Sequence, residues 1–193
     1  MRRIVLILAL VLFASAVPGA QSVSERQQKF DIEHELVRLP SYGVFDFIGF
    51  GYERGKVTLV GYAYQGGLKS HAARAVKRVG GIDEVDNKIE QLPASMNDDR
   101  IRWATFYNIY NDGFLSRYSP GGAMASRYEL YQWSRFPGMQ PFGTYPIHII
   151  VRNGRTTLMG VVDSEMDRRM AEIRAREVTG VFSVENELVV DSE

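Results

Sequence analysis

The side chains that could do acid-base or metal chemistry are few and far apart. The three histidines, His34, His71 and His148, fall in separate parts of the sequence. His34 and Glu35 begin like a zinc-binding helix, but Arg38 stands where the second histidine would be needed. We therefore predict no catalytic, metal or cofactor site, and we expect His148 to be an exposed or half-covered strand residue.

Two other chemistries are disfavoured. The chain has no cysteine, which excludes thiolate catalysis, a disulfide and a lipid-anchoring cysteine. Gly49, Gly51 and Gly55 are spaced somewhat like a dinucleotide-binding loop, but the last gap has three residues where the motif has two. They also lead into a predicted hairpin and not a helix, so the phosphate-binding geometry is missing.

One predicted helix carries a cluster of arginines. It could form a basic face for anionic headgroups, with each cation contributing on the order of 1 kcal/mol. Alternatively, the acidic residues among them neutralise an ordinary solvated face. The arginines are Arg168, Arg169, Arg174 and Arg176, and the acidic residues are Glu165, Asp167, Glu172 and Glu177.

Residues 111–145 form a long aromatic segment punctuated by glycine and proline. Tryptophan, tyrosine and arginine favour membrane interfaces and protein interfaces alike. The same residues could instead form a small local core under a long loop. Our candidate contact surface combines this segment with the basic helix and comprises Tyr131, Trp133, Phe136, Arg168 and Arg169.

A gap-free internal repeat organises the rest of the chain. Residues 48–89 match residues 147–188 at a constant offset of 99 positions. Such a repeat indicates two copies of one folding unit. The shared motif residues are Gly55, Gly61, Gly81 and Asn87 in the first copy and Gly154, Gly160, Gly180 and Asn186 in the second.

The second copy is the easier to interpret as structure. Apolar residues alternate over 147–151, which predicts a strand with one buried face. Asn153-Gly154 suits a two-residue hairpin turn into a second strand over 155–162. Gly160 lies late in that strand, where we expect it to allow close approach of another backbone, most simply a helix.

A helix and a final strand complete the unit. Ser164 is a potential helix cap, and Met166, Met170, Ile173 and Val178 form the apolar face of the helix. Gly180 is expected to end it as a C′ residue. A right-handed parallel crossover then leads into the strand over 184–190. The fold class is α+β, with two α-β-β-α-β modules, each a three-stranded mixed sheet with two helices on one face.

The ends of the chain set the domain boundaries. Residues 1–22 have the charged start, apolar run and small residues of a secretory signal peptide, although an uncleaved anchor is an alternative. The first module is expected over 24–92, beginning with a helix over 24–39 that Ser24 caps. A linker follows over 93–97, and the second module covers 98–191.

The motif order resembles the BON domain. It consists of a strand, a glycine turn, a strand ending in Gly61 or Gly160, an amphipathic helix, and a glycine-led strand containing Asn87 or Asn186. That family occurs in bacterial envelope proteins, often as tandem copies after a signal sequence and in stress-induced periplasmic proteins. The resemblance implies a periplasmic or secreted, non-enzymatic protein that contacts phospholipid or supports the envelope.

The charge balance and the predicted export limit the classes of partner that the protein could bind. The chain has 23 basic and 23 acidic residues, and removing Arg2 and Arg3 leaves 21 basic residues. This near-neutral balance disfavours a nucleic-acid partner. The main hypothesis is binding to a phospholipid surface or an envelope protein. The alternative is an assembly module that forms oligomers or a complex through its sheet edges. An enzyme would require the fold to bring distant polar residues together.

Overall fold

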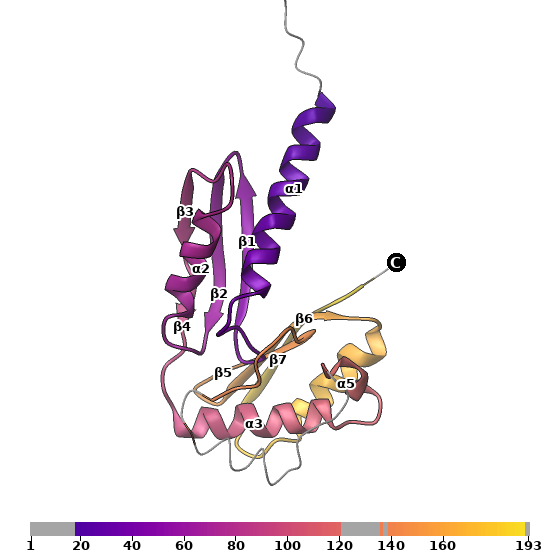
Figure 1. The fold of residues 1–193 in the computed structure, drawn as a ribbon. Helices are drawn as coiled ribbons and strands as arrows, with labels where there is room; N and C mark the ends of the chain where they lie inside the picture. Colours follow the sequence, from indigo (N-terminus) through magenta and orange to yellow (C-terminus); the bar gives the residue numbers. More distant parts are fainter. Residues whose placement is uncertain (1–17, 121–135, 137–138, 192–193) are drawn as a thin grey trace, which may run out of the picture.

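Two modules with the same topology build the molecule (Figure 1). The computed structural model describes residues 18–120, 136 and 139–191, with side chains from residue 25. The elements of the first module are α1 (Pro18–Val37), β1 (Phe47–Glu53), β2 (Lys56–Ala63), α2 (Leu68–Lys77), β3 (Glu84–Asn87) and β4 (Glu90–Gln91). Those of the second are α3 (Met96–Tyr110), the 3-10 helix η1 (Leu115–Tyr118), β5 (Ile147–Arg152), β6 (Arg155–Val162), α5 (Glu165–Arg176) and β7 (Ser183–Val190).

Each module contains a mixed sheet, as predicted. In the first, β2 pairs antiparallel with β1 and parallel with β3 and then β4. In the second, β6 pairs antiparallel with β5 and parallel with β7. The helices of each module pack against each other, α1 with α2 and α3 with α5. The α-β-β-α-β prediction is confirmed.

The same hydrogen bonds recur in both copies at the offset of 99. The amide group of Asn87 donates to the carbonyl of Lys69 at 2.7 Å, and that of Asn186 donates to the carbonyl of Arg168 at 2.8 Å. Each motif asparagine therefore ties the last strand to the second helix of its module.

The hairpin turns follow the sequence prediction. Asn153 and Gly154 have φ of 53° and 75°, the positive values that a two-residue primed turn requires. Arg54 and Gly55 adopt the same conformation at 46° and 80°. Asparagine and glycine tolerate this region at little cost, whereas arginine does not favour it.

Two predicted glycine roles were wrong in detail. A Cβ on Gly160 would lie 2.1 Å from the carbonyl oxygen of Pro146, and one on Gly61 would lie 2.1 Å from that of Phe47. The close neighbour is therefore the backbone at the start of the paired strand, not a helix. Gly180 is not at the C′ position, because the cap of α5 is Glu177 and Gly180 lies three residues later.

Helix α1 begins before the predicted start. It starts at Pro18, so Ser24 lies inside the helix and does not cap it. In the described part of α1, Ile32 and Leu36 are buried, and they join Leu68 and Leu59 in the core of the first module. Phe30 of the same helix is 60% exposed.

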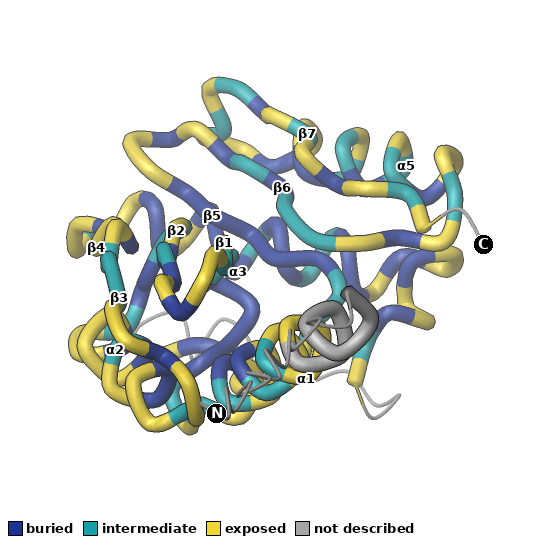
Figure 2. Tube along the Cα trace, turned by 90° about the horizontal axis from the view of Figure 1, so that it is seen from above, coloured by how far each residue is buried: buried dark blue, intermediate teal, exposed yellow. Residues whose placement is uncertain are grey.

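The two modules share buried surface. A segment of the first module, residues 41–46, lies along β5 of the second. The amide of Ile149 donates to the carbonyl of Val44 at 2.8 Å, and the Phe45 ring meets Trp103 edge-on in the second core. Figure 2 shows the resulting dark, continuously buried path along β5.

This contact corrects the prediction for β5. The strand was expected to bury one face, but Ile147 through Val151 are all buried. His148, expected to be exposed or half-covered, is 6% exposed and packs between the rings of Tyr42 and Phe47 at 5.4 and 5.6 Å. The alternating pattern could not show the second cover, because it comes from a segment about a hundred residues earlier.

Candidate functional site

The outer face of α5 in the second module carries exposed apolar side chains. Met166 is 63% exposed and Ile173 is 49% exposed, and both lie on the side of the helix turned away from the sheet. Met170 between them is half-buried. Of the predicted apolar face, Val178 is buried and Met170 is half-buried, whereas Met166 and Ile173 are exposed. Ala171 and Ala175, which the prediction placed beside them, form the buried side of the helix together with Asp167.

Ion pairs to the preceding segment hold the buried side of α5. Arg117 of η1 forms an ion pair with Asp167, and the Tyr118 hydroxyl donates to the same carboxylate at 3.1 Å. Burial alone would raise the pKa of Asp167, but hydrogen bonds from Ser164, Arg117 and Tyr118 outweigh it and lower the pKa. The carboxylate thus stays ionised and anchors the helix.

A second ion pair lies nearer the end of the same helix. Arg174 lies 2.7 Å from the carboxylate of Asp112, which also accepts the backbone amides of Phe114 and Leu115. Burial raises the pKa of Asp112, but these donors and Arg174 lower it overall. Because Asp167 and Arg174 share the inner side of α5 with only two small apolar residues, Ala171 and Ala175, the larger side chains of Met166 and Ile173 are left on the outer side.

The structure distinguishes the two predicted contact arginines. Arg168 is half-buried, donates to the carbonyl of Asn186 at 3.3 Å and pairs with Glu165 at 3.4 Å. Arg169 is exposed and donates only to the Glu165 carbonyl, with no carboxylate partner among the described residues. Arg174 and Arg176 are both ion-paired. Arg169 is therefore the arginine of α5 with its charge open to a partner.

The predicted aromatic part of the contact surface is only partly described. Phe136 is 61% exposed, while Tyr131 and Trp133 lie outside the described residues. The described aromatic residues of the segment differ in their exposure. Phe114 and Phe142 are exposed, whereas Tyr118 is buried against α5. We call Met166, Arg169, Met170 and Ile173 the α5 surface.

Comparison with protein families identifies the modules. The model of the BON domain matches residues 51–93 and 134–192, which together make up more than half of the chain. The chain belongs to the BON domain family. A comparison with curated proteins gives no match.

Among solved structures, the BON chain is similar to two of CdsD, a structural protein of the type III secretion system of Chlamydia trachomatis. One matches at 16% identity with a TM-score of 0.28, covering 86% of this chain and 92% of that one. The other, a C-terminal domain, matches at 15% identity with a TM-score of 0.26, covering 84% and 96%. Both TM-scores are below 0.5, so this likeness carries no argument about partners.

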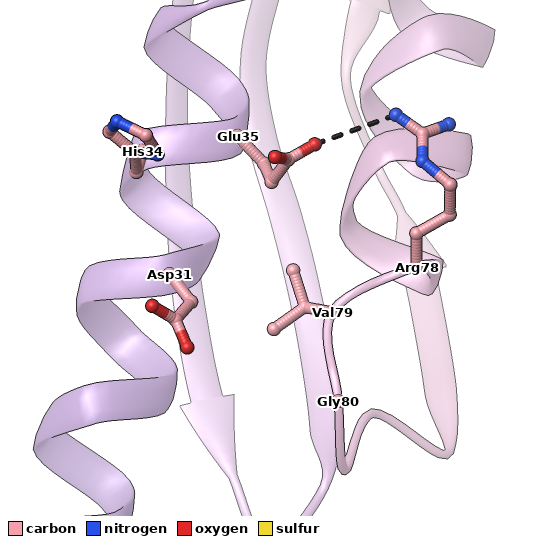
Figure 3. A pocket seen from close by; sticks show the side chains of 6 residues that line it. All are labelled: Asp31, His34, Glu35, Arg78, Val79 and Gly80. Atoms are coloured by element: carbon pink, nitrogen blue, oxygen red, sulfur yellow. Dashed lines mark hydrogen bonds and ion pairs between the residues drawn. The ribbon is translucent and has the colours of Figure 1, made fainter.

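A polar cleft in the first BON module tests the idea of an active site. It has a volume of about 260 Å³ and lies between α1 and the end of α2 (Figure 3). Glu35 is paired with Arg78 at 3.5 Å, and Asp31 accepts from Gln27 at 2.8 Å. The His34 ring projects from the opposite side of α1 and stacks on Phe30. The acid and base groups of the cleft do not converge on one point.

The junction between the BON modules contains two perturbed titratable groups. Burial lowers the pKa of His148 to about 4. Burial also raises the pKa of Asp46 to about 6, although Gln140 and the backbone amides of Tyr64 and Gly43 donate to its carboxylate. Both groups are enclosed by the protein, so we assign them to the stability of the junction.

Proposed function

We propose that this protein is an exported binding protein of the bacterial envelope that contacts anionic phospholipid through the α5 surface. The observation that carries the proposal is the exposure of Met166 and Ile173 beside Arg169. A helix with apolar side chains and a free cation on one exposed face suits the boundary between headgroups and acyl chains.

The equivalent helix of the first module, α2, lacks such a face, which supports a role for α5. The exposed apolar residues of the first-module helices, Phe30 and Val37, lie on α1. The position equivalent to Ile173 is Arg74, and the exposed side of α2 carries Lys69, Ser70 and His71. None of the exposed large apolar residues of the described chain belongs to α2. Contact through the second module alone is the simplest arrangement.

Export is the second part of the proposal. The charged start, apolar run and small residues of 1–22 fit a cleaved signal peptide, and BON proteins are typically found in the envelope. Periplasmic or secreted localisation, a role in envelope stress and phospholipid as the ligand extend this coarser family assignment. No helix in the described part of the chain is long and apolar enough to cross a membrane.

The aromatic segment would enlarge the contact. Phe136 is exposed, and Tyr131 and Trp133 remain proposed members of the surface because their side chain types favour membrane interfaces. Insertion of two apolar side chains and approach of one arginine would each contribute on the order of 1 kcal/mol or more.

Cosedimentation with liposomes tests the proposal. Purified protein is mixed at low salt with vesicles of phosphatidylglycerol and phosphatidylcholine, or of phosphatidylcholine alone. We expect binding to the anionic vesicles, with partitioning about fivefold weaker for Arg169→Gln and at least about tenfold weaker for the Met166→Ser, Ile173→Ser double variant.

The matched control is Arg74→Gln, which removes one exposed cation from the equivalent helix and should leave binding unchanged. Folded protein that binds neither vesicle at low salt would refute the lipid proposal. Equal loss of binding in Arg74→Gln and Arg169→Gln would show that net charge, and not the α5 surface, is responsible.

A further inference from the structure

The first strand of each sheet has one edge that β2 or β6 does not cover. In a two-residue hairpin the residues flanking the turn form a hydrogen-bonded pair, and such pairs alternate along the strands. Glu53 and Lys56 flank the first turn. The backbone groups of Phe50 and Tyr52 therefore point away from β2, as those of Ile149 and Val151 point away from β6.

The protein closes this edge in the second module. The amide of Ile149 donates to Val44, and the carbonyl of Val151 accepts from the buried Arg102. The Tyr110 hydroxyl donates to the carbonyl of Ile147 at 2.6 Å and lies 3.3 Å from its amide. Every outward-facing residue of β5 thus has a hydrogen bond on this side.

The equivalent edge of the first module is open at Phe50 and Tyr52, beyond Ile48, whose backbone is hydrogen-bonded to the Tyr42 side chain. The outward backbone groups of Phe50 and Tyr52 have no hydrogen bond to the described residues. A groove of about 240 Å³ runs beside this edge and is lined mainly by apolar groups. Its residues are Glu33, Leu36 and Val37 of α1, Tyr42, and Ile48, Gly49 and Phe50 of β1.

The composition of β1 is unusual for a free edge. Natural edge strands are commonly short or carry charges that prevent pairing with another chain. The strand β3 has four residues with two carboxylates, and β7 exposes Glu185 and Glu187. In contrast, β1 has seven residues with no charge before Glu53. Gly51 leaves open space where a side chain would be.

We propose that the β1 edge binds an extended segment of a partner protein, which adds as a further strand beside β1. The segment would have small or β-branched side chains, with alternate ones entering the groove under α1. At the equivalent edge of the second module, the amide of Ile149 donates to the carbonyl of Val44, so the backbone at this edge of the fold can bond to a segment from elsewhere. Glu33 on the groove wall favours a basic residue in the partner.

A second copy of this chain fits the edge less well. It would pair through its own β1 and would bring its own α1 to the edge with it. A single extended segment brings main-chain donors and acceptors without a helix. This surface lies on the first module and is independent of the α5 surface.

Amide hydrogen exchange on the full protein tests the proposal, with an acetyl-Lys-Thr-Val-Thr-Val-Thr-Lys-amide peptide as the probe. In free protein we expect fast exchange at Phe50 and Tyr52 and slow exchange at Gly49 and Gly51, which bond to β2. At saturating peptide, exchange at Phe50 and Tyr52 should slow by about tenfold or more. The same peptide N-methylated at every amide, which keeps the side chains but cannot donate, should have no effect.

Three results would overturn the proposal. Unchanged exchange at millimolar peptide would show that the edge does not accept a strand. Slow exchange in free monomer at every concentration would show that the chain closes the edge itself. Slow exchange that depends on protein concentration, together with a dimer by sedimentation, would identify a second copy as the occupant.

Discussion

The helices α2 and α5 occupy the same place in two copies of one module, yet their buried sides differ in polarity. Leu68 and Ala75 lie on the buried side of α2, and the equivalent residues of α5 are Asp167 and Arg174. In the first module this contact is apolar. In the second, ion pairs from Arg117 and Asp112 hold the helix.

The difference shows what the long segment after α3 achieves. It supplies charged partners for Asp167 and Arg174, which lie beside the buried Ala171 and Ala175 on the inner side of α5. Its apolar residues Met166 and Ile173 then point outward. The same fold thus exposes a polar helix surface on α2 and a partly apolar helix surface on α5.

The first strands of the two modules, β1 and β5, also differ, but here the first module has the more exposed feature. Val44 of the first module and Arg102 and Tyr110 of α3 close the β5 edge. In the first module, the β1 edge is open at Phe50 and Tyr52 among the described residues. Each module therefore presents a different exposed surface, the α5 surface on one and the β1 edge on the other.

The largest expected loss of stability comes from a glycine that has the same role in both modules, and we expect the loss to be equal in the two. Gly61→Ala and Gly160→Ala should each lower the free energy of unfolding by about 4 kcal/mol, because each Cβ would collide with a strand carbonyl and each φ is strongly positive. Urea denaturation measures both. Gly66→Ala, where a Cβ meets nothing, is the control.

Because α2 and α5 differ in which side chains they bury, we expect substitutions at their apolar residues to change the free energy of unfolding by unequal amounts. Leu68→Ala should lower the free energy of unfolding by about 3 kcal/mol, since Leu68 is fully buried. Met166→Ala should change it by less than about 0.5 kcal/mol, since Met166 is largely exposed. Similar costs in urea denaturation would contradict the assignment of inner and outer faces.

A carboxylate on α3 distinguishes the two hairpins. Asp98 is buried and accepts the amides of Asn153 and Gly154, both at 2.9 Å. Asp98→Ala should lower the free energy of unfolding by about 2 to 3 kcal/mol, because one buried and one partly buried amide lose their acceptor. Lys29→Ala, an exposed change on α1, should cost almost nothing by the same denaturation measurement.

The buried junction predicts a pH effect. The pKa of His148 falls from 6.5 to about 4 on folding, so the unfolded chain binds more protons between these values and stability falls as the pH drops. The raised pKa of Asp46 acts in the opposite direction between 3.8 and about 6, so the two effects partly cancel in the native protein.

The substitution His148→Phe isolates the histidine and keeps the ring contacts. Relative to pH 7, the native protein should lose about 2 kcal/mol more stability at pH 5 than the variant does. Urea denaturation at the two pH values measures this difference. A difference that does not change with pH would show that His148 is not buried in its neutral form.

The sequence predicted the backbone better than the surfaces. The Asn153-Gly154 turn and the offset of 99 depend on neighbouring residues and on comparison of the two copies, and both gave the correct topology. Gly160 was recognised as a close-approach glycine, but the approaching strand could not be told from a helix by position alone.

The surfaces depend on contacts that are distant in the sequence. Met166 and Ile173 have the spacing of a buried stripe, and only the pairing of Asp167 with Arg117 reveals that the other side of the helix faces inward. Asp98 accepts the amide of Gly154 in a hairpin 56 residues away, a contact that its own sequence neighbours do not reveal. The open β1 edge becomes visible only beside the closed β5 edge.

Labels at one equivalent position on the two helices test the central claim most directly. The chain has no cysteine, so Ile173→Cys and Arg74→Cys can each carry a single environment-sensitive NBD fluorophore. On addition of anionic vesicles, we expect the label at 173 to brighten and shift to the blue, and the label at 74 to stay unchanged. An equal response at both positions, or none at 173, would contradict contact through the second module.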